Sequence, residues 1–191
     1  LLKPGPDGSY GFHDRTLESV EQDLGDHIGD DEAREARLRL LRRQLDYVRA
    51  VRDSLDDSQG RRSGDETGPL HLSADEAGRW LTAERRNLRE AVRFHLESGE
   101  TERRVLMELC ELVGPPLLRI GYTRDAELFL SNAVRLAVEL GDHRAEADSR
   151  RSLGGRVFRM FDRYLEAEEE LTRAMELYAR LEDPEGEAGA R

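Results

Sequence analysis

The chain has 191 residues, of which 37% are charged, 37% hydrophobic and only 6% aromatic, a balance that favours packed helices over a β-sandwich or barrel. Its formal net charge of −11 repels phosphate backbones and argues against direct binding of nucleic acid. The single cysteine excludes an intrachain disulfide, and the lack of a long apolar run or a signal peptide leads us to expect a cytoplasmic, all-α region.

Residues 1–55 are expected to form a small strand-and-turn element followed by helices. Residues 1–13 are dense in turn residues, and from Asp14, which can cap a helix, apolar residues recur at helical spacing. A further helix is predicted from about Asp31 to Leu55. Its apolar stripe comprises Leu38, Leu40, Leu41, Leu45, Val48, Val51 and Leu55.

The best boundary in the chain lies at residues 56–72, which we interpret as a flexible linker rich in Gly, Ser and charge. It separates residues 1–55 from residues 73–191. The second part opens on Ser73 with Glu76 three residues on, a spacing that predicts a capping box. The helix that follows is expected to end at Gly99 as a C′ glycine.

The second part repeats itself. The segment LSNAVRLAVELGD (130–142) aligns with LTRAMELYARLED (171–183) at an offset of 41 residues, and Gly114 aligns with Gly155 at the same offset. Residues 87–100 form a weaker earlier copy. A fixed period with two helices per unit predicts a helical-hairpin solenoid. The alternative is a helical bundle with accidental periodicity.

The order of small and large residues within each unit resembles the tetratricopeptide repeat (TPR), although the usual TPR period is about 34. We therefore expect residues 73–191 to be TPR-like helical repeats. The last residues, 182–191, align with the start of the first helix of another unit, at 141–150. We expect that the last repeat is truncated and that both ends of the chain are cut.

Residues with catalytic or metal-binding chemistry are scarce. The five histidines show no metal-ligand spacing with one another or with Cys110, which lies in the apolar run Val105–Val113 and is expected to be a buried thiol. Neither a phosphate-cradling glycine loop nor a nucleophile elbow is present. Carboxylate pairs are expected on solvated helix faces. We expect no enzyme activity, metal or cofactor in this part of the protein.

Arginines on the first helix of each unit are the candidates for partner binding. Because that helix lines the concave groove of a TPR, Arg156 and Arg159 should face the groove, with Arg119 as the approximate match in the preceding unit. Guanidinium groups suit carboxylate recognition, which predicts an acidic peptide or another domain of the same protein as the partner. The alternative is ordinary exposed arginines paired with neighbouring glutamates. Trp80 is expected to pack at the start of the array.

Three stretches in order resemble the bacterial NB-ARC/STAND signal-transduction ATPases that carry C-terminal TPRs, including the SARP-type (Streptomyces antibiotic regulatory protein) transcriptional regulators. SYGFHDRTLESVEQDL is similar to the end of that family's winged-helix subdomain, and RLRLLRRQLDYVRAV is similar to the helix that follows. SADEAGRWLTAERRNLREAV is similar to the first helix of its repeat array. The matching residues in that helix are Trp80, Leu81, Glu84, Arg85, Asn87 and Leu88.

The resemblance implies a nucleotide contact in the intact protein. The family motif is Met-His-Asp, whose His touches the β-phosphate of bound ADP, so that role falls on His13, with Asp14 bracing the strand–helix junction. Phe12 replaces the Met, and Arg15-Thr16 stands where related sequences often carry an apolar residue. ADP or ATP with Mg²⁺ is expected only in a full-length protein. The alternative is that Asp14 simply caps a helix.

Together with the repeat pattern, the resemblance implies the sensor and interaction region of a multidomain signal-transduction ATPase that acts as a transcriptional regulator. The TPR-like units would bind a protein partner or the ATPase core, with no direct contact to nucleic acid or membrane. The alternative is a stand-alone TPR scaffold that binds an acidic peptide in a groove lined by Arg119, Arg156 and Arg159. An enzyme is the third hypothesis, and no motif supports it.

Overall fold

A computed structural model describes residues 2–4, 10–12, 29–57 and 72–191 and divides into two compact units, Leu1–Leu40 and Leu41–Arg191, each described here by itself. In the first unit, strand β1 (Leu2–Pro4) pairs antiparallel with strand β2 (Tyr10–Phe12). The predicted strands at the start of the chain are therefore present. The predicted helix from Asp14, and His13, lie outside the described residues.

Helix α2 (Asp30–Asp57) confirms the predicted helix between Asp31 and Leu55. Most of its predicted apolar stripe is buried, namely Leu41, Leu45, Val48, Val51 and Leu55. The prediction was wrong for Leu40, which is 60% exposed. Leu40 precedes the buried Leu41 by one position, about 100° around the helix, so it lies on a different face.

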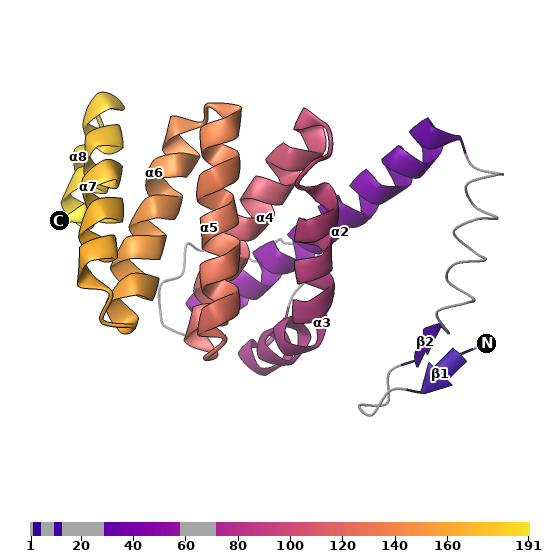
Figure 1. Cartoon of the computed structure of the whole chain (residues 1–191). Helices are drawn as coiled ribbons and strands as arrows, with labels where there is room; N and C mark the ends of the chain where they lie inside the picture. Colours follow the sequence, from indigo (N-terminus) through magenta and orange to yellow (C-terminus); the bar gives the residue numbers. More distant parts are fainter. Residues whose placement is uncertain (1, 5–9, 13–28, 58–71) are drawn as a thin grey trace. The chain divides into compact units, whose positions relative to one another are not determined.

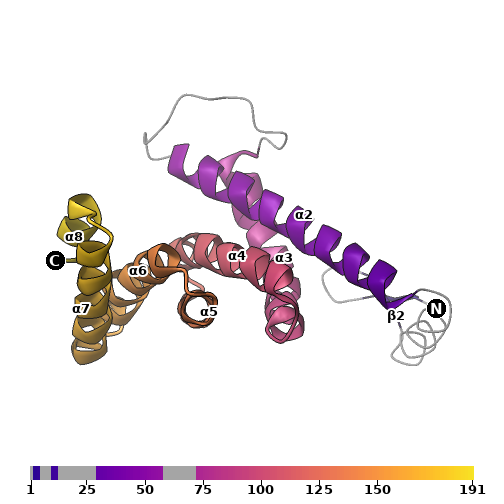
Figure 2. The same cartoon turned by 90° about the horizontal axis from the view of Figure 1, so that it is seen from above.

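The remaining described residues of the second unit, 72–191, are all helical apart from short turns. Consecutive helices from α3 to α8 pack against one another. Figure 1 shows α4, α5, α6 and α7 side by side in chain order, and Figure 2, in which α5 is seen end-on, places α5 beside α4 and α6. The elements are α3 (Ala74–His95), α4 (Glu100–Arg119), α5 (Thr123–Leu140), α6 (His143–Ser152), η1 (Leu153–Phe158), α7 (Tyr164–Arg180) and α8 (Pro184–Ala190).

The start of α3 matches the sequence prediction and its end does not. Ser73 Oγ accepts from the Glu76 backbone N–H, and the Glu76 carboxylate accepts from the Ser73 backbone N–H at 2.9 Å, which completes the capping box. The helix ends at His95, and Gly99 is the N-cap of α4 with φ −62° rather than a left-handed C′ residue. Gly141 does take the left-handed conformation, at the end of α5.

The core of the second unit is built from leucines, valines and alanines of α2 to α6. Trp80 is partly buried against this core and stacks on Tyr47 with 5.3 Å between ring centroids, which ties α3 to α2. Cys110 is fully buried, as expected, and burial raises the pKa of its thiol. A thiol held in its neutral form packs as a small apolar side chain.

The helical stretch between residues 143 and 158 is not a continuous α-helix. Helix α6 ends at Ser152, and residues 153–158 continue the chain as the π-helical turn η1. Gly154 lies within this turn, and a Cβ atom there would stand 2.9 Å from the Ala167 carbonyl oxygen of α7. The backbone of η1 thus approaches α7 closely, and the wider turn allows that approach while Val157 and Phe158 stay buried.

Candidate functional site

The main candidate site is a surface hollow of about 420 Å³ between α4 and the start of α6. Glu108 and Glu111 reach it from α4, where a spacing of three residues places them on one helix face. Asp148 reaches it from α6, and Asp142 is the N-cap of that helix. The full lining is Arg104, Met107, Glu108, Glu111, Asp142, Arg144, Ala145 and Asp148.

Three of these carboxylates already have partners. Glu108 accepts from Arg49 Nη2 at 2.6 Å, a contact that also joins α4 to α2. Asp148 accepts from the Tyr178 hydroxyl at 2.6 Å, and Asp142 accepts from a backbone N–H of α6 at 3.0 Å. These carboxylates are therefore held in place as parts of the helix packing.

Glu111 is different, because within the described part of the chain it makes neither an ion pair nor a hydrogen bond. Burial, together with the negative charges of Asp148, Glu108 and Asp142 and against the opposing effect of Arg52, raises the pKa of its carboxyl group to about 7. The proton on Glu111 is thus easily lost near neutral pH. A cationic group entering the hollow would favour the ionised form and be held by it.

Of the predicted arginines, Arg119 is engaged elsewhere. Its Nη1 donates to the carbonyl oxygen of Leu55 at 2.8 Å, across 64 positions of sequence. Helix α2 has no basic residue in its last turn, so Arg119 supplies both a donor and a positive charge to that end. Its guanidinium therefore serves the packing of α2, and its predicted role toward a partner stays a prediction.

Arg156 and Arg159 lie exposed on η1 and at its C-cap. An arginine that binds a partner must be exposed. The predicted role of these two residues in partner binding stays a prediction. His13, the predicted nucleotide contact, lies outside the described residues.

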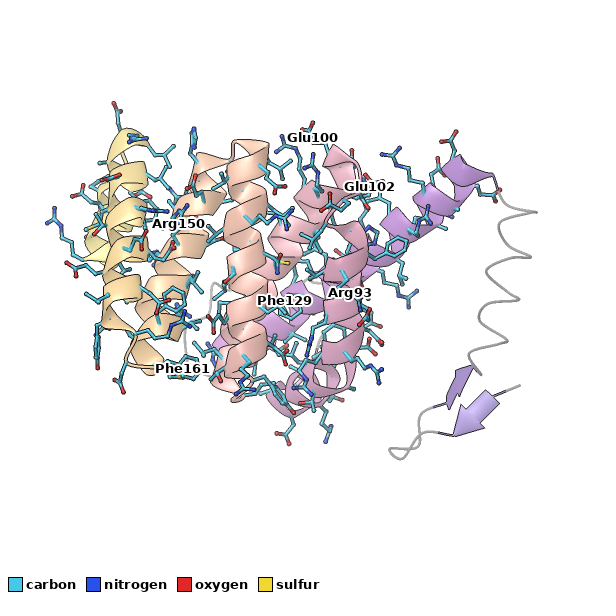
Figure 3. The ribbon with its side chains drawn as sticks, in the orientation of Figure 1. Arg93, Glu100, Glu102, Phe129, Arg150 and Phe161 are labelled. Atoms are coloured by element: carbon cyan, nitrogen blue, oxygen red, sulfur yellow. The ribbon has the colours of Figure 1, made fainter. Side chains whose placement is uncertain are left out.

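A second unassigned surface is the turn between η1 and α7, called here the 160–165 turn. Met160, Phe161, Tyr164 and Leu165 are 56%, 41%, 62% and 84% exposed. Figure 3 places Phe161 at the end of the helical layer, where α6–η1 passes into α7. Four large apolar side chains exposed within six residues form a surface that folding of the described chain leaves uncovered.

Sequence reasoning missed both surfaces. The signal for the hollow was the presence of Glu108 and Glu111 inside the apolar run Val105–Val113, where most neighbours are buried. The signal for the 160–165 turn was weaker. Phe161 aligns at the offset of 41 with Ile120, which is partly buried against the core, so the alignment alone does not indicate an exposed residue.

Within the described ranges, the side chains hold no cluster of three His, Cys, Asp or Glu residues that could bind a metal ion. Likewise, no described helix is both long and apolar enough to span a bilayer. Comparisons of the chain with protein-family models, with curated proteins and with solved structures found no match.

Proposed function

We propose that residues 73–191 are a TPR-like array that binds a protein segment across the face formed by α4 and α6–η1. The observation that carries the proposal is the recurrence of local geometry at the sequence offset of 41 residues. The residues that end the helices illustrate it. Gly121 and Asp162 both have positive φ (90° and 57°), and so do Gly141 and Glu182 (67° and 55°).

Helix starts recur at the same offset. Asp142 accepts from the Ala145 backbone N–H at 3.0 Å, and Asp183 accepts from the Gly186 backbone N–H at 2.9 Å. An aspartate cap at the start of α6 and another at the start of α8 favour the same chain reversal at both positions. The recurrence supports a tandem array over an irregular bundle.

The contact between the two helices of each segment also recurs. A Cβ atom on Gly114 would lie 2.5 Å from Leu130 Cγ, and one on Gly155 would lie 3.6 Å from Leu171 Cδ2. Each glycine therefore faces the leucine 16 positions later, on the following helix. Small residues at this position let the paired helices approach closely, which is the feature that the TPR resemblance rests on.

The proposed binding face carries negative charge around Glu111 and positive charge at Arg156 and Arg159. The hollow around Glu111 suits a lysine or arginine side chain of the partner, whereas Arg156 and Arg159 suit a carboxylate. In the alternative, a stand-alone scaffold would bind an acidic peptide through Arg156 and Arg159 and not through the hollow around Glu111. Arg119 contributes less to either version because it bonds to Leu55.

The wider proposal is that this array is the sensor and interaction region of a regulator of the NB-ARC/STAND kind. It is supported by the order of the three resembling stretches and by Ser73 and Trp80 at the start of the array. In such a protein His13 would contact ADP, and ATP with Mg²⁺ would bind to domains other than this one. A coding sequence upstream of Leu1 that lacks a phosphate-binding loop would contradict this wider proposal alone.

The binding proposal is tested by fluorescence polarisation with two labelled pools of short peptides, one with fixed acidic and one with fixed basic positions. We expect the chain to bind at least one pool in low salt. Arg159→Glu should weaken binding of the acidic pool about tenfold, and Glu111→Arg should weaken binding of the basic pool similarly. Neither pool binding the wild-type chain would contradict the proposal.

Two variants at exposed positions on α3 and just after it, away from this face, serve as matched controls. Arg93→Glu reverses a charge on α3 whose side chain is 81% exposed, and Glu97→Arg does the same just after α3 at 86% exposure. Both should bind each pool as the wild type does. Equal losses in the controls and in the site variants would show that net charge, not the face, governs binding.

A further inference from the structure

Helix α2 supplies positive charge to the edge of the hollow around Glu111. The Arg49 guanidinium donates to Glu108 Oε1 from Nε at 3.1 Å and from Nη2 at 2.6 Å, and Glu108 lines that hollow. A second arginine of α2 acts on the same place, because burial raises the pKa of Glu111 and the charge of Arg52 opposes that rise. Guanidinium groups of the chain itself therefore lie where a basic side chain of the partner is proposed to bind.

The ion pair between Arg49 and Glu108 is open to exchange. Its side chains are 45% and 41% exposed, and exposed pairs contribute little net stability because water and salt compete with both partners. Arg49 also has a second carboxylate within reach on its own helix, since its Nη1 donates to Asp46 Oδ1 at 3.1 Å. The guanidinium can thus leave Glu108 and still keep an acidic partner.

Asp148, on the opposite side of the hollow, is held more firmly than Glu108. Its side chain is 25% exposed, and it accepts from the hydroxyl of the fully buried Tyr178 at 2.6 Å and from Arg144 Nε at 3.1 Å. Moving Asp148 would leave the buried Tyr178 hydroxyl proton without its acceptor, which is costly. Glu108 is therefore the paired carboxylate of this hollow that can most easily change its partner.

We propose that Arg49 is an intramolecular competitor for the hollow, which neutralises Glu108 in the unbound chain and gives way to a basic side chain of the partner. On binding, Arg49 keeps its contact with Asp46, and Glu108 joins Glu111 in holding the incoming cation. The inference rests on the proposed function, because it concerns the same hollow and the same class of partner. Such competition lowers the affinity for every basic segment, so only segments that also contact the rest of the face bind well.

Fluorescence polarisation of the full chain with the basic peptide pool tests this competition. Arg49→Met keeps an unbranched side chain but removes the guanidinium, and it should bind the pool about three- to fivefold tighter than the control does. The control, Arg173→Met, changes the net charge equally by breaking another exposed ion pair, that with Glu169 on α7, where the arginine is 52% exposed. In a Glu108→Gln background, the Arg49→Met substitution should change affinity by less than about twofold, because the contested carboxylate is gone.

Three results would overturn the competition. These are equal affinities of Arg49→Met and Arg173→Met for the basic pool, an equal gain with and without Glu108, and an equal gain for the acidic pool, which would mean that the substitution loosens α2. Circular dichroism checks that all variants fold. A wild type that binds the basic pool as tightly as Arg49→Met does contradicts the competition and leaves the proposed function standing. Failure of both the wild type and Arg49→Met to bind either pool contradicts both.

Discussion

The helix pair α4–α5 and the segment α6–η1–α7 are related by the 41-residue sequence pattern, yet their interiors differ in kind. In the first, Leu109 and Phe129 are fully buried. At the aligned positions of the second, a buried Arg150 donates to Glu170 at 2.6 Å and to Glu146 at 2.8 Å. Figure 3 shows Phe129 on α5 and Arg150 between α6 and α7.

The two helix pairs are therefore held together by different interactions, apolar burial in the first and a buried ion pair in the second. Apolar burial stabilises the first pair in proportion to the area removed from water. The ion pair in the second must first offset the loss of hydration of its charges, so its net contribution is smaller, but its geometry is directional. We therefore expect the ion pair to stabilise the second segment less than apolar burial stabilises the first.

The largest effect should come from breaking the apolar interior. Phe129→Ala removes a fully buried aromatic ring and should lower the free energy of unfolding by about 3–5 kcal/mol. Glu170→Ala, at the aligned position, removes one of two carboxylates around Arg150 and should cost less. Urea denaturation followed by circular dichroism measures both. A larger loss for Glu170→Ala would reverse the comparison.

A second experiment replaces the charged residues of the second helix pair by the apolar types that occupy the aligned positions of the first. Arg150→Leu leaves Glu146 and Glu170, whose side chains are 14% and 18% exposed, without their arginine partner. It should lower the free energy of unfolding by about 3 kcal/mol. The double variant Arg150→Leu/Glu170→Phe should recover part of that loss because it restores an apolar pair. Thermal denaturation of the single and double variants measures this difference. A double variant that unfolds at a lower temperature than Arg150→Leu would contradict the expected recovery.

Two glycines test how tightly each helix pair is packed. Gly114→Ala places a methyl group against Leu130 and should cost about 1–3 kcal/mol by overpacking. Gly155→Ala meets only an ordinary contact with Leu171 and should change stability by less than about 0.5 kcal/mol. Chemical denaturation of the two variants gives both values. Equal losses would mean that Gly155 has no more room beside Leu171 than Gly114 has beside Leu130.

The smallest effect concerns Glu111, whose pKa is raised to about 7 in the folded state from an ordinary 4.5. Between these values the folded chain binds more protons than the unfolded one, so stability falls as pH rises through this window. Glu111→Gln should flatten the profile and be more stable by about 1–2 kcal/mol above pH 7, after allowance for partial exposure. Unfolding midpoints from pH 4 to pH 8 check this, and a wild type that gains stability across this range relative to Glu111→Gln would contradict it.

Much of the helical organisation could be predicted from the sequence because its signals are local. Helix α2 follows from apolar spacing, and the start of α3 follows from the Ser73 and Glu76 pair. Gly99 was misread because its position after a helix looks the same whether it ends that helix or caps the next. The π-helical turn η1 was not predicted, and the close approach of Gly154 to Ala167 within it joins residues 13 positions apart, which local patterns do not record.

The candidate site was less predictable for a similar reason. The pKa of Glu111 is raised first by burial and then by charges that include Asp148 and Asp142, which are more than 30 positions away and line the same hollow. The role of Arg119 depends on where α2 ends, 64 positions earlier. Such long-range relations set which charged residues have partners and which remain available.

The central claim is that the face across α4 and α6–η1 binds a protein segment. It is tested most directly by backbone amide chemical-shift mapping with the tighter-binding of the two peptide pools. The account predicts that the perturbed amides cluster around Glu111, Asp148 and Arg159. Perturbations confined to the outer faces of α5 and α7, with none near Glu111 or Arg159, would contradict it.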